Sequence, residues 1–114
     1  MHELGFASQI EETLVDLMKE QSLEVITEVT VDIGEATGVV PRFLLECWPA
    51  AIEDTPIQGC VLKVNEIKAK GECRRCEKTF PVTATHGVCP HCGASDEYDM
   101  LSGYEFEITE ILGH

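Results

Sequence analysis

Apolar residues recur at helical spacing over residues 3–21, while charged residues occupy the other positions. The apolar stripe consists of Phe6, Ala7, Ile10, Leu14, Leu17 and Met18. Side chains that recur every three to four residues lie on one face of an amphipathic helix. We therefore predict a helix that begins almost at the first residue and packs this stripe against a core.

A half-buried strand is predicted after this helix. Val25, Thr27, Val29, Val31 and Ile33 alternate with Glu24, Ile26, Glu28, Thr30 and Asp32. Alternation with a period of two places one set toward the core and the other toward solvent. The stretch Gly34-Glu35-Ala36-Thr37-Gly38 then ends the strand. No Gly-Lys-Ser/Thr sequence follows, so we interpret this stretch as an ordinary turn and not as a phosphate-binding loop.

A second helix is predicted over residues 41–54, because Pro41 suits the first turn of a helix. Its predicted apolar face consists of Phe43, Leu44, Cys47, Trp48 and Ala51. Pro49 lies inside this helix and lacks a backbone donor, which predicts a kink or a break. Cys47 and Cys60 are interpreted as small core residues.

Two more strand-like stretches cover residues 61–70 and 104–109. In the first, Leu62 and Val64 lie on one face, whereas Ile67 and Ala69 lie on the other. This switch predicts a bulge, or the point where the chain leaves the main sheet. The order of elements predicts an α/β (α+β) fold with two helices on a small three-stranded sheet. Residues 1–70 plus 98–114 form the main domain, and residues 71–97 form an inserted module.

The inserted module contains two paired cysteine motifs. The motifs are Cys73-Arg74-Arg75-Cys76 and Cys89-Pro90-His91-Cys92, with Gly87 before and Gly93 after the second pair. Glycines suit the tight backbone of such turns. Two C-x-x-C turns that face each other supply four thiolates to a tetrahedral Zn²⁺ ion. We predict a structural, zinc-ribbon-like Cys₄ site.

The cysteines have three alternative uses. Four thiolates also hold iron, and Cys-Pro-x-Cys-Gly occurs in rubredoxin-type turns, which would make the protein an electron carrier. A redox dithiol calls for a strand-to-helix setting, and no helical pattern follows Cys76. Disulfides require an oxidising compartment, to which nothing in the chain points. Zinc fits the paired spacing best.

Length and charge narrow the class of protein. The chain has 114 residues and a formal net charge of −13. A chain of this size forms one modest domain, and its acidity speaks against nucleic acid as a partner. Basic residues cluster near the first cysteine pair: Lys63, Lys68, Lys70, Arg74, Arg75 and Lys78. We interpret them as offsetting the negative Cys₄ centre and the surrounding acidity; a nucleic-acid-binding zinc ribbon is the competing hypothesis.

Location and catalysis are also constrained. No basic leader opens the chain, and no apolar run approaches the roughly 20 residues that span a bilayer. We therefore expect a cytoplasmic protein without membrane contact. No nucleophile–base pair or phosphate loop is evident, so we do not expect an enzyme.

The amino terminus, Met1-His2-Glu3, offers a second set of metal ligands. The terminal amine of Met1 and the backbone and imidazole nitrogens of His2 can form two fused chelate rings. Glu3 can add a fourth donor. Nearly coplanar nitrogen and oxygen donors suit Ni(II) or Cu(II). The alternative is that the terminus has no function, as is common for terminal residues.

Several of these features together resemble the HypA/HybF family of nickel metallochaperones. They are Met1-His2-Glu3-Leu4, Asp32-Ile33-Gly34-Glu35, Cys47-Trp48 and the spaced cysteine pairs, and the resemblance covers essentially the whole chain. It implies Ni²⁺ bound by His2 with a contribution from Glu3, and structural zinc on the four cysteines.

The resemblance also implies how such a carrier works. In the family, the metallochaperone acts with the GTPase HypB to deliver nickel to the [NiFe]-hydrogenase large subunit, and some members also serve urease maturation proteins. The expected role is therefore that of a carrier and not a catalyst. Both a monomer and a weak homodimer remain open.

Overall fold

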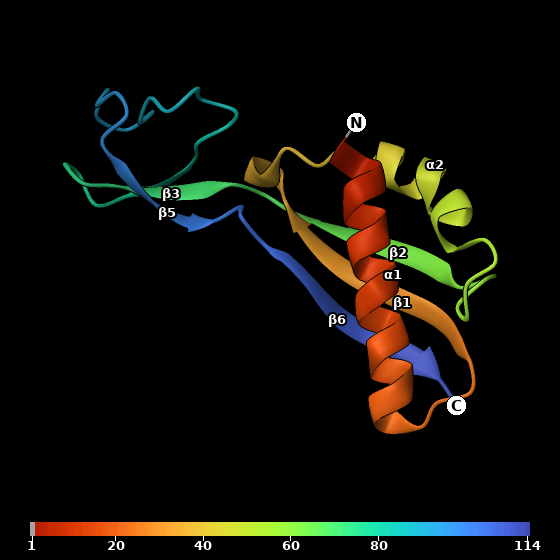
Figure 1. Ribbon diagram of the computed structural model, residues 1–114. Coiled ribbons are helices and arrows are strands. Elements are labelled where there is room, and N and C mark those ends of the chain that lie inside the picture. The colour runs from red at the N-terminus through yellow and green to blue at the C-terminus, as the bar shows by residue number, and fades with distance from the viewer. Residues whose placement is uncertain (1) are drawn as a thin grey trace.

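The chain forms two helices and two small sheets in the computed structural model (Figure 1). The structure describes the backbone of residues 2–114 and the side chains of residues 3–114. The described elements are α1 (His2–Gln21), β1 (Ile26–Gly34), the 3-10 turn η1 (Glu35–Thr37), α2 (Pro41–Ile52), β2 (Val61–Ile67), β3 (Lys70–Cys73), β4 (Thr79–Pro81), β5 (Tyr98–Ser102) and β6 (Phe106–Gly113). This arrangement confirms the predicted α+β class.

The first sheet has the strand order β2-β1-β6 and carries both helices on one face (Figure 1). β1 runs parallel to β2 and antiparallel to β6. The parallel pairing is possible because α2 crosses over the sheet between the two strands. The core under the helices contains Ala7, Ile10, Leu14, Met18, Val29, Val31, Ile33, Leu44, Trp48, Ile52 and Ile57, among others.

The predicted faces hold for α1 but fail at the start of β1. Ile26 is buried, whereas Val25 is 40% exposed, the reverse of the predicted alternation. The pairing of β1 with β6 is irregular between Ile26 and Glu28. A one-residue irregularity turns side chains to the opposite face of a sheet. The prediction was therefore wrong only before the irregularity.

α2 begins at Pro41, as predicted, and continues through Pro49 to Ile52, so of the predicted kink or break the break does not occur. Leu44, Trp48 and Ile52 form its buried face. Phe43 was predicted on that face but is 39% exposed. Its ring lies 4.8 Å below the guanidinium of Arg42, a cation–π contact that suits an exposed aromatic ring.

The two remaining cysteines lie in and beside the first core, as predicted. Cys47 is half-buried on α2, and Cys60 is buried just before β2. The indole Nε1 of Trp48 donates a hydrogen bond to the carbonyl of Cys60 at 2.8 Å. This bond satisfies the buried indole and attaches α2 to the start of β2.

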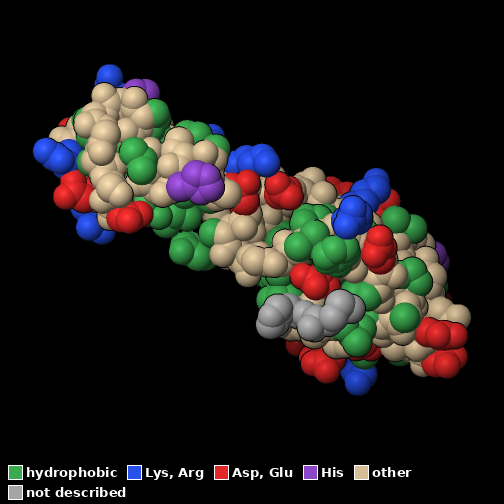
Figure 2. All heavy atoms as spheres, turned by 90° about the horizontal axis from the view of Figure 1, so that it is seen from above, with side chains coloured by type: hydrophobic (Ala, Val, Ile, Leu, Met, Phe, Trp, Pro, Cys, Tyr) green, Lys and Arg blue, Asp and Glu red, His purple; other side chains and the backbone are tan. Residues whose placement is uncertain are grey.

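The second sheet has the strand order β4-β3-β5 and carries the paired cysteines. The chain leaves the first sheet after Ile67 and enters the second at Lys70, so of the alternatives predicted for the change of face, departure from the sheet is the one observed. β5 pairs with β3, so Tyr98–Ser102 lies in this second sheet. The prediction from the sequence assigns residues 98–114 to the first domain. The molecule is elongated, 54 × 27 × 15 Å, with the second sheet at one end (Figures 1 and 2).

Gly34 lies where the two sheets meet. Its N–H donates to the carbonyl of Glu105 at 2.7 Å. A Cβ atom at Gly34 would overlap the carbonyl group of Gly103 and would lie 2.7 Å from the backbone nitrogen of Glu105. These are backbone atoms, which cannot move aside without disturbing the strands that they connect.

Gly34→Ala is therefore expected to lower the free energy of unfolding by about 2 kcal/mol or more, because the added methyl group has no space. Gly5→Ala is the matched control, since no atom lies within 4 Å of the added Cβ. Alanine is favoured over glycine inside a helix by roughly 0.5–1 kcal/mol, so the control should be neutral or stabilising. Urea unfolding of both variants would measure the difference, and equal effects would contradict the prediction.

Candidate metal centre

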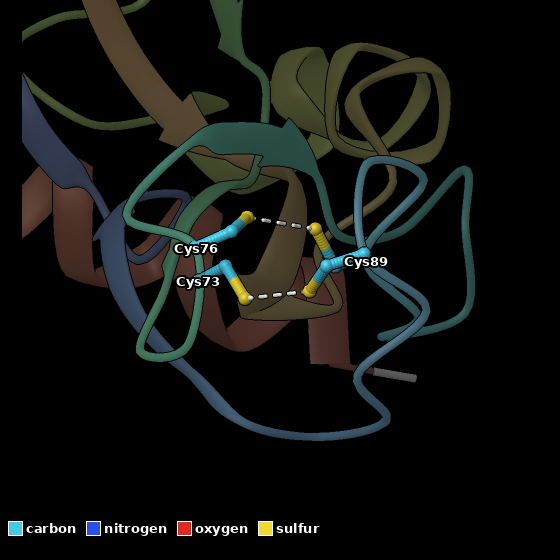
Figure 3. A group of neighbouring side chains, drawn as sticks. Cys73, Cys76 and Cys89 are labelled. Carbon is cyan, nitrogen blue, oxygen red and sulfur yellow. Dashed lines mark hydrogen bonds between the residues drawn. The ribbon is translucent and has the colours of Figure 1, made fainter.

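The four paired cysteines converge at the end of the second sheet. Cys73 is the last residue of β3 and Cys76 lies in the following turn, while Cys89 and Cys92 lie in the loop between β4 and β5. The four Sγ atoms all lie within 4.8 Å of one another. The pairs Cys73–Cys92 and Cys76–Cys89 have sulfur–sulfur distances of 3.6 Å. In Figure 3, the thiols of Cys73, Cys76 and Cys89 point into one space.

The two cysteine turns have the same backbone construction. Cys73 N–H donates to Lys78, five residues on, and Cys89 N–H donates in the same way to Ala94. The fourth residue after the first cysteine of each pair, Glu77 or Gly93, has a positive φ and donates its N–H back to that cysteine. Gly93 was predicted for such a tight turn; Glu77 adopts the conformation despite its side chain.

This donor set fits a tetrahedral metal ion. Metal–sulfur bonds of about 2.3 Å around a tetrahedron place sulfurs about 3.8 Å apart, close to the pairs observed here. All six cysteines are free, and the first pair lies in a turn that leads to β4 and not to a helix. The arrangement therefore favours a metal site over the disulfide and redox-dithiol alternatives. Among the side chains of residues 3–114, these cysteines form the one such group of metal ligands.

The thiols differ in acidity, and the difference follows their pairing. The backbone N–H of Cys76 is the main cause that lowers the pKa of Cys73 to about 7. For Cys76, the N–H of Lys78 lowers the pKa, but burial and the neighbouring thiols raise it to about 11. In the second Cys-x-x-Cys turn, burial opposes ionisation of Cys89, but the backbone N–H groups of His91 and Cys92 lower its pKa. The N–H of Ala94 lowers the pKa of Cys92, but burial and the thiols of Cys73 and Cys89 raise it.

The two sulfur pairs that lie 3.6 Å apart, Cys73–Cys92 and Cys76–Cys89, thus each combine one thiol of lowered pKa with one of raised pKa. Four thiolates in so small a volume repel one another, so without a cation some thiols must remain protonated. A divalent cation removes this repulsion and displaces the remaining protons. The site is consequently suited to hold a cation and to release protons as it does so.

The basic side chains beside the cysteines face acidic ones. Arg74 Nη2 lies 2.9 Å from Asp99 Oδ1, and Arg75 Nε lies 3.6 Å from Glu97 Oε2. Figure 2 shows basic side chains in small groups next to acidic ones on the face that it displays. Arginines held by carboxylates are less available to phosphates. This pairing favours the charge-balancing interpretation of the basic cluster.

The predicted amino-terminal ligands fall partly outside the described residues. Met1 and the side chain of His2 lie outside them, whereas Glu3 lies inside. Glu3 is only 6% exposed, and its Oε2 accepts a hydrogen bond from the N–H of Val40 at 3.2 Å. Val40 is the residue before α2, so the carboxylate lies at the amino-terminal end of that helix, where negative charge is favoured.

This contact between Glu3 and Val40 was not predicted from the sequence. It attaches the first turn of α1 to the start of α2 through two residues that are 37 positions apart in the chain. Glu3 lies four residues before Ala7 and so on the same face of the helix as the apolar stripe, and that position was the available signal. The partner could not be inferred, because it is a backbone group on another element.

The fold and the site define a small metal-binding protein in which a helix-bearing sheet carries a four-cysteine centre at one end. The chain belongs to the HypA family: the family model described as "Hydrogenase/urease nickel incorporation, metallochaperone, hypA" matches residues 1–112. The chain is 31% identical over 111 residues to the hydrogenase maturation factor HypA of Chlorobaculum parvum, with 97% of each chain covered. It is 34% identical over 113 residues to the HypA of Geobacter metallireducens, again with 97% of each covered.

Solved structures show the same fold. The solution structure of the Ni metallochaperone HypA from Helicobacter pylori aligns with a TM-score of 0.66 at 22% identity, covering 97% of this chain and 96% of that one. A second HypA solution structure aligns with a TM-score of 0.69 at 22% identity, covering 100% and 97%. The family is one of metallochaperones for hydrogenase maturation. No helix in the described part of the chain is both long and apolar enough to cross a membrane.

Proposed function

We propose that this protein carries Ni²⁺ at its amino terminus, holds Zn²⁺ on its four cysteines, and delivers the nickel for [NiFe]-hydrogenase maturation. The observation that carries this proposal is the match of the nickel metallochaperone family model to residues 1–112. The nickel ligands are the terminal amine of Met1, the nitrogens of His2 and the carboxylate of Glu3. The zinc ligands are Cys73, Cys76, Cys89 and Cys92.

The amino-terminal site suits a carrier that must release its cargo. Amine, imidazole and carboxylate donors bind nickel only when deprotonated, so affinity falls as the pH falls. A metal site at the end of a chain exchanges its metal ion more easily than an enclosed site does. The position of Glu3 supports this proposal, because its hydrogen bond to Val40 holds the carboxylate in place at the first turn of α1.

Zinc is proposed for the cysteine site because of its donors. Four thiolates with no open coordination position are typical of structural zinc sites, which contribute to folding and not to catalysis. The burial of Cys73 and Cys89, each 1% exposed, supports a structural role. Iron is the alternative metal for the same four ligands.

The partners proposed for this carrier are proteins of nickel-enzyme maturation. We include the GTPase HypB, the hydrogenase large subunit and, for urease, its maturation proteins; the family description names both hydrogenase and urease. The cytoplasm is the proposed location, since reducing conditions keep cysteines free for metal. Nucleic acid is not a proposed partner, given the net charge of −13.

The two metal sites are proposed to lie in separate units. Residues 1–70 and 98–114 form the nickel-binding unit, and residues 71–97 form the zinc-binding unit. The pairing of β5 with β3 supports moving Tyr98–Ser102 to the zinc-binding unit. The two separate buried clusters of the chain support such a division.

Metal analysis of untagged protein, before and after the addition of nickel, tests the proposal. The purified protein is expected to be colourless and to contain about one equivalent of zinc. After addition of nickel and removal of excess, about one equivalent of nickel should be bound with the zinc unchanged. A red, iron-containing protein would support the rubredoxin-like alternative. Nickel that displaces zinc from the cysteines would contradict separate sites.

A further inference from the structure

The two sheets are joined in a way that leaves their relative orientation poorly defined by packing. Each sheet has its own buried cluster, and no buried residue belongs to both clusters among the described residues. A hollow of about 310 Å³ opens between the turn η1 and the second sheet, with Ala36, Val82, Thr83, His86 and Tyr104 in its lining. Without a shared core, something other than side-chain packing must fix the angle between the sheets.

Two short connections carry the chain between the sheets. Residues 68–69 lead from β2 to β3, and residues 103–105 lead from β5 back to β6. The connections are attached to each other, because the hydroxyl of Ser102 donates to the carbonyl of Lys68 at 2.8 Å. Taken alone, this pair of connections could bend as a unit relative to the first sheet.

The turn η1 attaches these connections to the first sheet. The N–H groups of Gly34 and Ala36 donate to the carbonyls of Glu105 and Gly103, each at 2.7 Å. These bonds reach only the connection from β5 to β6. The connection from β2 to β3 is reached by a side chain instead, that of Glu35.

The carboxylate of Glu35 satisfies a buried donor on that connection. Its Oε1 accepts a hydrogen bond from the N–H of Ala69 at 3.0 Å. Ala69 is 1% exposed and belongs to the buried cluster of the second sheet. A buried backbone N–H requires a partner, so loss of this carboxylate would leave Ala69 unsatisfied or would force the connection to move.

The same carboxylate has two further neighbours. Lys68 Nζ lies 3.7 Å from Glu35 Oε2. The N–H of Ala69, the hydroxyl of Thr83 in the second sheet's loop, and Lys68 all lower the pKa of Glu35, against a smaller opposing effect of burial. The side chain is therefore ionised at neutral pH, as a strong acceptor for the Ala69 N–H requires.

We propose that Glu35 is a positioning residue that holds the four-cysteine sheet at one orientation to the helix-bearing sheet, through its bond to the N–H of Ala69. This inference does not depend on which metals the protein carries. It explains why a carboxylate follows Gly34. Gly34 lets β1 approach the connection from β5 to β6, and Glu35 then binds the connection from β2 to β3. The bond also fixes the distance between the first turn of α1 and the cysteines. Glu3 in that turn binds Val40, and Val40 follows the turn η1 that contains Glu35.

Residual dipolar couplings of backbone amides in the untagged, zinc-supplemented protein test this proposal. In the wild type, a single alignment tensor should fit the amides of both sheets. In Glu35→Ala the two sheets should lose their common tensor, and amide exchange at Ala69 should accelerate about tenfold or more. Glu35→Gln retains an oxygen acceptor for Ala69 and should restore the common tensor. Zinc content should be unchanged in each variant, which distinguishes this result from a failure of the metal proposal.

Glu66→Ala is the matched control. Glu66 Oε1 lies 3.1 Å from the same Lys68 Nζ, but Glu66 belongs to β2 within the first sheet. This variant removes an acidic neighbour of Lys68 and should keep the wild-type tensor. A common tensor and slow Ala69 exchange in Glu35→Ala would overturn the proposal, and so would a Gln variant that behaves like the Ala variant. If Glu35→Ala does not fold, an unprotected Ala69 amide in the wild type would overturn it as well.

Discussion

Tight nickel binding is expected to be lost when the chain is extended by one residue before Met1. The extension moves the free amine away from His2, so the two fused chelate rings can no longer form with the same atoms. His2→Ala should have the same effect, because it removes the imidazole. For a site that depends on both donors, loss of either should weaken binding by at least about a hundredfold, which corresponds to about 2.7 kcal/mol.

Isothermal titration of nickel into each variant, with zinc quantified in the same samples, measures this effect. Zinc should remain bound, because its proposed ligands belong to the second sheet and its loops and not to α1. Figure 1 shows that sheet as a separate part of the molecule. His91→Ala is the matched control, since His91 lies between the cysteines of the second pair and outside the proposed nickel site. Unaltered nickel affinity in the extended protein would remove the proposed amino-terminal site. Loss of nickel binding in His91→Ala would move the site to the cysteine module.

Cys73→Ser is expected to remove the metal from the cysteine site and to unfold the second sheet. The buried cluster there consists of Ala69, Cys73, Phe80, Val82, Cys89 and Ala94. Two of these six residues are proposed ligands, and so small an apolar cluster cannot offset the conformational entropy of the loops around it. In zinc-finger peptides the bound ion contributes roughly 10–16 kcal/mol of apparent folding free energy at neutral pH.

Amide spectra of the Cys73→Ser variant should lose dispersion for residues 70–102 while the signals of α1 and β1 remain. The first sheet has its own core under two helices and does not use these cysteines. Cys47→Ser is the matched control: Cys47 is half-buried on α2 and lies outside the group of four. It should retain both the metal and the spectrum of the second sheet. A folded, metal-free second sheet in Cys73→Ser would show that metal is not required for its structure.

The sequence determined those features that depend on local spacing. The stripe from Ala7 to Met18 places its side chains on one face of any helix, so burial of that face could be predicted. Each Cys-x-x-C segment is short enough to form its turn alone, and the pairing of two such segments predicted the four-sulfur site. The change of face between Val64 and Ala69 correctly indicated where the chain leaves the first sheet.

Features that depend on contacts between distant segments were decided by the tertiary structure. The irregular pairing opposite β6 places Ile26, and not Val25, in the core. Glu3 is buried because Val40 supplies a donor, and Glu35 meets Ala69 because the two sheets join beside η1. Tyr98–Ser102 joins the second sheet because β3 offers it an edge. In each case the deciding partner is a backbone group far away in the chain, and backbone groups leave no mark in the residue pattern.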